Sequence, residues 1–111
     1  MMETYIREAR VINIKMKELI LEENSKGNYI YIGRGKCPVT GQTSKWKNPF
    51  IIGKDGTREE VIKKYEKYIR NKPELLKDLN KLKNKLLGCY CKPDYACHGD
   101  ILIKLLKEND E

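Results

Sequence analysis

Long apolar segments are missing from this 111-residue sequence, and none approaches the roughly 18–20 residues needed to span a bilayer. The first ten residues, MMETYIREAR, lack the apolar core of a secretory signal peptide. We therefore expect a cytoplasmic protein with no membrane partner. Because cytosolic thiols stay reduced, the four cysteines predict metal ligands, a reactive thiol or core packing rather than a disulfide framework.

Acidic residues are absent from residues 24–54, although the chain as a whole carries 16 of them. The basic residues of this acid-free stretch are Lys26, Arg34, Lys36, Lys45, Lys47 and Lys54. A surface that needs only solubility usually mixes both signs of charge. The stretch therefore predicts an anionic partner, a nucleotide or a nucleic acid.

The length predicts a single domain over residues 1–111, and 40% hydrophobic with 35% charged residues is ordinary for a globular protein. Apolar, β-branched segments predict strands at residues 10–14, 29–33 and 86–91. The segment between the first two strands fits either a short helix or a continuing strand. Residues 36–55 show no regular period, and loops of this length in compact domains tend to be functional.

Apolar residues at helical spacing predict helices over residues 57–69, 73–86 and 99–109. Thr57 and Glu60 form a capping box at the start of the first of these helices, and Pro73 suits the first turn of the second. The order of elements predicts a small α/β domain with a Rossmann-like, partly parallel sheet and about three helices.

Three of the four cysteines and the only histidine are concentrated in the segment GCYCKPDYACHGD, residues 88–100. In a strand Cys89 and Cys91 would face the same side. Cys97 and His98 follow at the predicted start of the last helix, where the helix dipole favours a thiolate. In open α/β sheets ligands bind where a strand ends and the next helix begins, so we expect a site here.

Three interpretations of this segment are compatible with the sequence. Tetrahedral zinc would use Cys89, Cys91, Cys97 and His98, or Cys37 in place of the histidine, although Cys-x-Cys is not the commoner knuckle spacing. In a second interpretation Cys97 is a nucleophile and His98 or Asp100 serves as acid or base. In a third, the cysteines fill the core while His98 and Asp100 cap the helix.

The acid-free stretch contains two candidate ligand-binding segments. The turn Gly33-Arg34-Gly35 can bring backbone N–H groups and a guanidinium to a phosphate, although no standard nucleotide fingerprint is present. In the second segment, Trp46 either stacks on a base between two lysines or anchors the loop in the core together with Phe50. The predicted nucleotide pocket consists of Gly33, Arg34, Gly35, Ser44, Lys45, Trp46 and Asn48.

The segments YIYIGRG, SKWKNPF and LLGCYCKPDYACHGDILIKLL resemble an uncharacterised family of small domains found in bacteriophages and bacteria. Members of that family carry Tyr-Ile-Gly-Arg, Lys-Trp-Gly-Asn-Pro-Phe and Cys-x-Cys-x-Pro-x-x-Cys-His-Gly-Asp motifs. The resemblance runs from Tyr29 to Leu106 and implies no function. This chain has Lys47 where the family usually has glycine, and its loop before Cys97 is longer, which loosens any metal geometry inferred from the family.

These observations together predict a nucleotide- or nucleic-acid-binding α/β domain. If the domain is an enzyme, the sequence predicts that it acts on a nucleotide or a base, but no general-base pair identifies the reaction. The alternative is a non-enzymatic, zinc-stabilised module that binds nucleic acid or a host protein.

Overall fold

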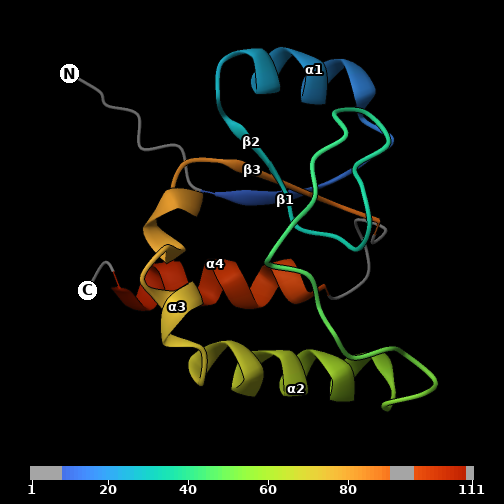
Figure 1. Ribbon diagram of the computed structural model, residues 1–111, viewed down its shortest axis with the longest axis vertical. Coiled ribbons are helices and arrows are strands. Elements are labelled where there is room, and N and C mark those ends of the chain that lie inside the picture. The colour runs from blue at the N-terminus through green and yellow to red at the C-terminus, as the bar shows by residue number, and fades with distance from the viewer. Residues whose placement is uncertain (1–8, 91–96, 110–111) are drawn as a thin grey trace.

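The computed structural model describes residues 9–90 and 97–109, and a parallel three-stranded sheet lies at its centre (Figure 1). Its strands are β1 (Arg10–Asn13), β3 (Leu86–Cys89) and β2 (Tyr29–Tyr31), in that spatial order. Asn13 pairs with Cys89, and Tyr31 pairs with Gly88. The carboxyl ends of all three strands therefore meet at one edge of the sheet.

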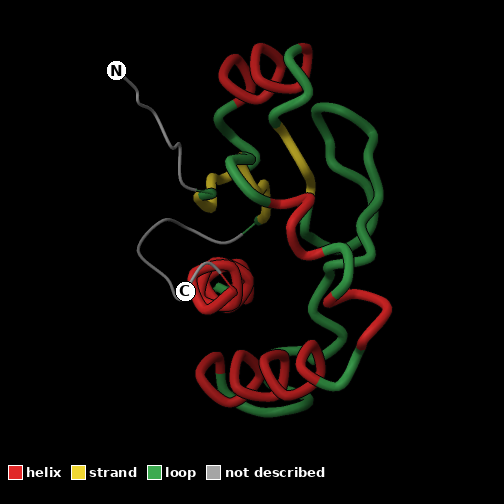
Figure 2. The backbone as a smooth tube through the Cα atoms, turned by 90° about the vertical axis from the view of Figure 1, so that its left-hand side faces the viewer, coloured by secondary structure: helices red, strands yellow, loops and turns green. Residues whose placement is uncertain are grey.

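Helices cover both faces of the sheet, as parallel strands require because their connections must cross over. Helix α1 (Lys17–Ser25) lies on one face, and α4 (His98–Asn109) lies on the other (Figures 1 and 2). Helix α2 (Arg58–Arg70) packs on the outer side of α4, and the short α3 (Pro73–Leu76) follows it. Glu66 links α2 to α4 through an ion pair of 3.1 Å with Lys104.

The sheet separates two hydrophobic clusters. Leu87 belongs to the larger cluster, between the sheet and α4, whereas the adjacent Leu86 belongs to the smaller cluster beside α1. Successive strand residues face opposite sides, so β3 is buried on both faces, as a central parallel strand should be. This burial on both faces accounts for the continuous apolar sequence of β3.

The predicted α/β fold is confirmed, and the described strands are all parallel rather than only partly so. The described residues form four α-helices because the ambiguous segment after β1 forms α1. The predicted helix over residues 73–86 is wrong beyond Leu76, where a 3-10 turn at Leu79–Leu82 replaces it. Asn84 then adopts a positive φ of 64°, and Leu86 begins β3 by donating its N–H to Asn28. Pairing with both neighbouring strands outweighs the helical spacing of the leucines.

Among the described residues, no helix combines the length and the apolar character that a bilayer crossing demands.

The capping box of α2 yields a direct test of its contribution to stability. Thr57 Oγ1 accepts the N–H of Glu60 at 3.2 Å, and Glu60 Oε1 accepts the N–H of Thr57 at 2.8 Å. Substitution of Thr57→Ala should lower the free energy of unfolding by about 1 kcal/mol, because a backbone N–H of the first turn loses its acceptor. Urea denaturation measures the loss. Thr57→Ser keeps the hydroxyl, and equal destabilisation by both substitutions would contradict the capping role.

Candidate functional site

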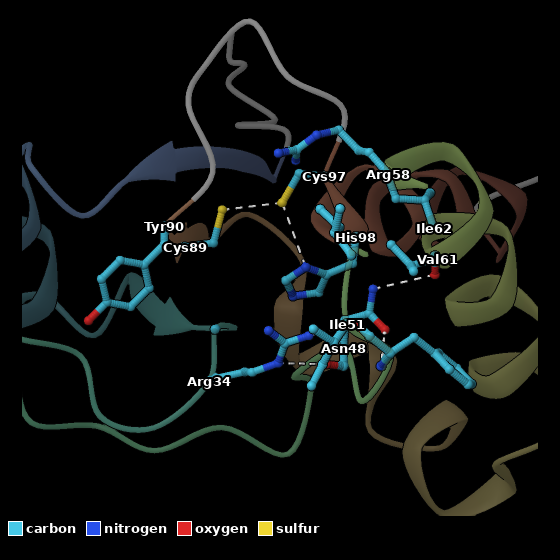
Figure 3. Close-up of a pocket in the computed structure, with 13 residues that line it drawn as sticks. Arg34, Asn48, Ile51, Arg58, Val61, Ile62, Cys89, Tyr90, Cys97 and His98 are labelled. Atoms are coloured by element: carbon cyan, nitrogen blue, oxygen red, sulfur yellow. Dashed lines mark hydrogen bonds between the residues drawn. The ribbon is translucent and has the colours of Figure 1, made fainter. Parts of the chain in front are cut away.

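A cavity of about 410 Å³ opens at the carboxyl edge of the sheet (Figure 3). Its polar lining includes Arg34, Asn48, Arg58, Cys97 and His98. Its apolar lining is contributed by Phe50, Ile51, Ile52, Val61 and Ile62. The cavity therefore lies where the parallel topology predicts a ligand site, and it combines these polar residues with an apolar wall formed by the five hydrophobic ones.

Two thiols that line the cavity lie in contact with each other. Cys89 ends β3, and Cys97 immediately precedes α4. Their Sγ atoms are 3.2 Å apart, and the residues are 1% and 3% exposed. Gly99 donates its backbone N–H to Cys97 Sγ at 3.4 Å, so this sulfur lies at the N-terminal end of the helix. Both the N–H group and the helix dipole favour negative charge on Cys97 Sγ.

His98 is held in one orientation beside these thiols. Its Nε2 lies 2.7 Å from the carbonyl oxygen of Ile32, which can only accept a hydrogen bond, so Nε2 carries the proton. In the neutral ring Nδ1 is then unprotonated, and it lies 3.7 Å from Cys97 Sγ. The imidazole also contacts the ring of Tyr65 in an edge-to-face arrangement, at 5.0 Å between centroids. These contacts present a basic nitrogen to the sulfur of Cys97.

Tyr65 connects this histidine to the loop around Trp46, within the acid-free stretch. Its hydroxyl donates a hydrogen bond of 2.6 Å to the carbonyl oxygen of Trp46, and burial raises the pKa of the phenol well above its ordinary value. Tyr65 therefore stays neutral and keeps its proton in this bond. Through this side chain, α2 fixes both the loop around Trp46 and the ring of His98.

Arg34 and Arg58 reach the cavity from opposite sides, with Cys97 and His98 between them in Figure 3. Arg34 Nε donates to the carbonyl of Asn48 at 3.1 Å, and its Nη2 donates to the carbonyl of Phe50 at 2.6 Å. These carbonyl bonds orient the guanidinium without neutralising it. Within residues 9–90 and 97–109, no carboxylate forms an ion pair with Arg34.

The structure brings only part of the predicted nucleotide pocket together. Gly33, Arg34 and Asn48 line the cavity, whereas Gly35 lies outside it in an exposed turn with a φ of 63°. Asn48 also braces the loop, because its Oδ1 accepts the N–H of Phe50 at 2.9 Å. The amide of Asn48 is therefore committed partly to the loop itself.

The prediction for residues 44–46 is corrected by the structure. Trp46 is 4% exposed within the larger hydrophobic cluster, so the loop-anchoring alternative describes it and its ring is not a stacking surface. Ser44 Oγ accepts the N–H of Trp46, and Lys45 forms an ion pair with Asp78. None of the three lines the cavity. A buried anchor and an exposed platform have the same sequence pattern, and only packing separates them.

Of the remaining candidates, Asp100 caps helix α4, and Cys37 lies on the other side of the sheet. Asp100 Oδ2 accepts the N–H of Cys97 at 3.0 Å, which is the capping role, and Asp100 does not line the cavity. Cys37 is buried in the smaller cluster, on the other side of the sheet, with its Sγ 3.2 Å from the hydroxyl of Tyr29. Cys37 therefore cannot replace His98 beside Cys97, and that option is wrong.

The zinc prediction depends on Cys91, which lies outside the described residues. In the part of the chain that the structure describes, no group of three or more His, Cys, Asp or Glu side chains is arranged to hold a metal ion. The four-ligand site predicted from Cys89, Cys91, Cys97 and His98 stays a prediction.

Sequence reasoning missed Arg58 and the isoleucines of the cavity wall. Arg58 is the first residue of α2 and directly follows the capping residue Thr57. The capping box located this helix start in the sequence, but nothing in the sequence placed that start beside Cys97. Ile51 and Ile52 lie in the long loop of residues 36–55, where the lack of a regular period gave no sign of their position.

Comparison with known proteins places the chain in a family. Residues 13–108 match the family described as "Domain of unknown function (DUF4326)". The chain belongs to this family. Uncharacterized protein R718 of Acanthamoeba polyphaga mimivirus is 42% identical over 88 residues, a match that covers 70% of this chain and 66% of that relative. No solved structure matches.

The DUF4326 match confirms the resemblance to a family of small domains without an assigned function. It does not test the predicted motifs or the occurrence in bacteriophages and bacteria.

The hydrogen bond from His98 to Ile32 should contribute to the stability of this DUF4326 domain. Removing the ring by His98→Ala should cost about 1–3 kcal/mol of unfolding free energy, because a buried bond to a carbonyl is lost. His98→Gln offers an amide N–H at a similar reach and should recover part of the loss. Urea denaturation of both variants measures the difference. Equal losses would show that the ring packing against Tyr65, and not the hydrogen bond, holds this contact.

Proposed function

We propose that this domain binds a nucleotide in the cavity, with its phosphate between Arg34 and Arg58 and its base and sugar along the apolar wall. The observation that carries the proposal is the fixed orientation and the positive charge of the Arg34 guanidinium. Two backbone carbonyls fix its guanidinium at the cavity, and no carboxylate of the described residues neutralises it. A positioned guanidinium with unneutralised charge suits a phosphate or a carboxylate.

The cavity supports a small ligand over a nucleic-acid chain. Its volume of about 410 Å³ falls within the range typical of small-molecule sites. Of the basic residues in the acid-free stretch, Lys26 forms ion pairs with Glu22 and Glu23, and Lys45 forms one with Asp78. The exposed Lys36, Lys47 and Lys54 do not line the cavity. These features favour a compact anion over an extended phosphate backbone.

The apolar wall supports a ligand larger than inorganic phosphate. Phe50 lies against Tyr68 at 6.2 Å between ring centroids, so the loop that carries the wall is anchored on α2. The neighbouring Ile51 and Ile52 are exposed. A nucleoside that covered them would add apolar burial to the electrostatic attraction of the two arginines.

Calorimetric titration with mononucleotides and with the matching nucleosides tests the proposal. Nucleotide binding should weaken about tenfold in Arg34→Gln, because a charge-assisted contact is lost, and less in Arg34→Lys, which keeps the charge. Lys47→Gln removes a basic residue of the same stretch outside the cavity and serves as the matched control. It should leave binding unchanged.

Two outcomes would contradict the proposal. Equal affinity for nucleoside and nucleotide would show that the phosphate does not contribute to binding at the site. Equal weakening by Lys47→Gln and Arg34→Gln, together with steep salt dependence for single-stranded DNA or RNA, would identify a polymeric partner instead.

One observation favours the alternative of a non-enzymatic, zinc-stabilised binding module. The bond from His98 Nε2 to Ile32 leaves Nδ1 facing the thiols, which is the arrangement of a metal-binding histidine held by a backbone carbonyl. Metal analysis of protein purified without chelators tests this alternative. Stoichiometric zinc whose removal unfolds the domain would support it.

A further inference from the structure

We propose that Cys97 and Cys89 form a redox-active dithiol that reduces a small anionic disulfide entering the cavity. This activity goes beyond nucleotide binding and does not depend on it. It rests on the contact between the two sulfur atoms, on their different positions in the fold and on the arginines around them.

The separation of the two Sγ atoms, 3.2 Å, suits a dithiol. A disulfide bond measures about 2.0 Å, so the sulfurs need to approach by roughly 1 Å to form one. Two thiolates bound to one tetrahedral zinc, each at about 2.3 Å, lie roughly 3.8 Å apart. The observed contact is shorter than two sulfurs on one zinc require and longer than a bond, so it is the contact of two adjacent thiols that a small movement can join.

The fold gives the two thiols different roles. Cys97 Sγ accepts the N–H of Gly99 and lies at the N-terminus of the 12-residue helix α4, so it is the sulfur that best carries negative charge. His98 Nδ1 lies 3.7 Å from the same sulfur. Cys89 lies at the end of the central strand, with its Sγ 3.2 Å from Cys97 Sγ. Cys97 is therefore the attacking thiol and Cys89 the resolving thiol.

The exchange balances without any further oxidant. The Cys97 thiolate attacks one sulfur of a disulfide R–S–S–R; a bond forms between Cys97 and that sulfur, and the other half leaves as R–S⁻. The Cys89 thiolate then attacks Cys97 Sγ, which forms the Cys89–Cys97 disulfide and releases the second R–S⁻. Two electrons pass from the cysteines to the substrate, and the two cysteine protons end on the two R–SH products.

The charge around the thiols indicates the class of substrate. Both sulfurs line the cavity that Arg34 and Arg58 flank, and its volume of about 410 Å³ admits a small molecule or one half of a larger one. The charge of Arg34, whose guanidinium is hydrogen-bonded to carbonyl oxygens, attracts an anionic substrate and repels a cationic one. We therefore assign the site to disulfides that carry carboxylate or phosphate groups.

Treatment of the reduced protein with oxidised glutathione, an anionic disulfide, tests the dithiol. Mass spectrometry should show the loss of two hydrogen atoms, and peptide mapping should join Cys89 to Cys97. Cys89→Ala should accumulate a glutathione adduct on Cys97, because the resolving thiol is missing, and Cys97→Ala should form neither product. Cys37→Ser, on the other side of the sheet, is the matched control and should exchange as the unsubstituted protein does.

Linkage between any other pair of cysteines, or no linkage at all, would overturn the proposal. So would stoichiometric zinc that protects Cys89 and Cys97 from alkylation in the purified protein. Mapping of the unsubstituted protein decides among these outcomes even if a variant fails to fold.

A comparison of two disulfides tests the substrate class. Arg34→Gln should react with oxidised glutathione about tenfold more slowly, and with the cationic disulfide cystamine at least as fast as the unsubstituted protein. Equal slowing with both disulfides would show that Arg34 supports the loop without selecting the substrate. The disulfide assay contains no nucleotide. Its failure would therefore not count against nucleotide binding, which the calorimetric titration tests separately.

Discussion

Strand β3 is buried on both faces and hydrogen-bonded to a parallel neighbour on each side, and this position determines where the site can form. Its last residue, Cys89, must emerge at the edge where β1 and β2 also end. The chain then enters α4, which packs against the same sheet, so Cys97 is returned to the side of Cys89. The contact between residues that lie eight positions apart follows from the parallel topology together with the packing of the last helix.

Close packing at two glycines makes this arrangement possible. A Cβ atom on Gly88 would overlap the ring of Tyr29, which packs across β3 toward Cys37. A Cβ atom on Gly99 would approach Ile32 Cδ1 to 2.8 Å and would also overlap Val11. The first turn of α4 can therefore approach the sheet closely only with glycine after His98. That approach brings the imidazole within hydrogen-bonding distance of the Ile32 carbonyl.

The sequence predicted the parts of this structure that depend on local patterns. The strand segments, the start of α2 at its capping box and the position of Cys97 at the start of α4 follow from residue type and spacing over a few positions. The end of α3 could not be predicted in this way, because Leu86 has the spacing of a helix and pairs instead with two distant strands. The surroundings of Trp46 and Arg58 could not be predicted for the same reason. Segments far away in the sequence determine them.

The acid-free stretch shows how charge in a sequence differs from charge at a site. Lys45 is matched by Asp78, from the segment after α3, and Lys26 by carboxylates of α1, so two of the six positive charges are locally compensated. Arg34 is different because its hydrogen bonds go to carbonyl oxygens, which orient a cation but carry no net charge. An electrostatic site requires a positioned charge without a compensating partner, and a count of basic residues cannot provide that information. The hydrogen bonds from Arg34 to the loop carbonyls, and not the abundance of lysine, place a positive charge at this edge of the sheet.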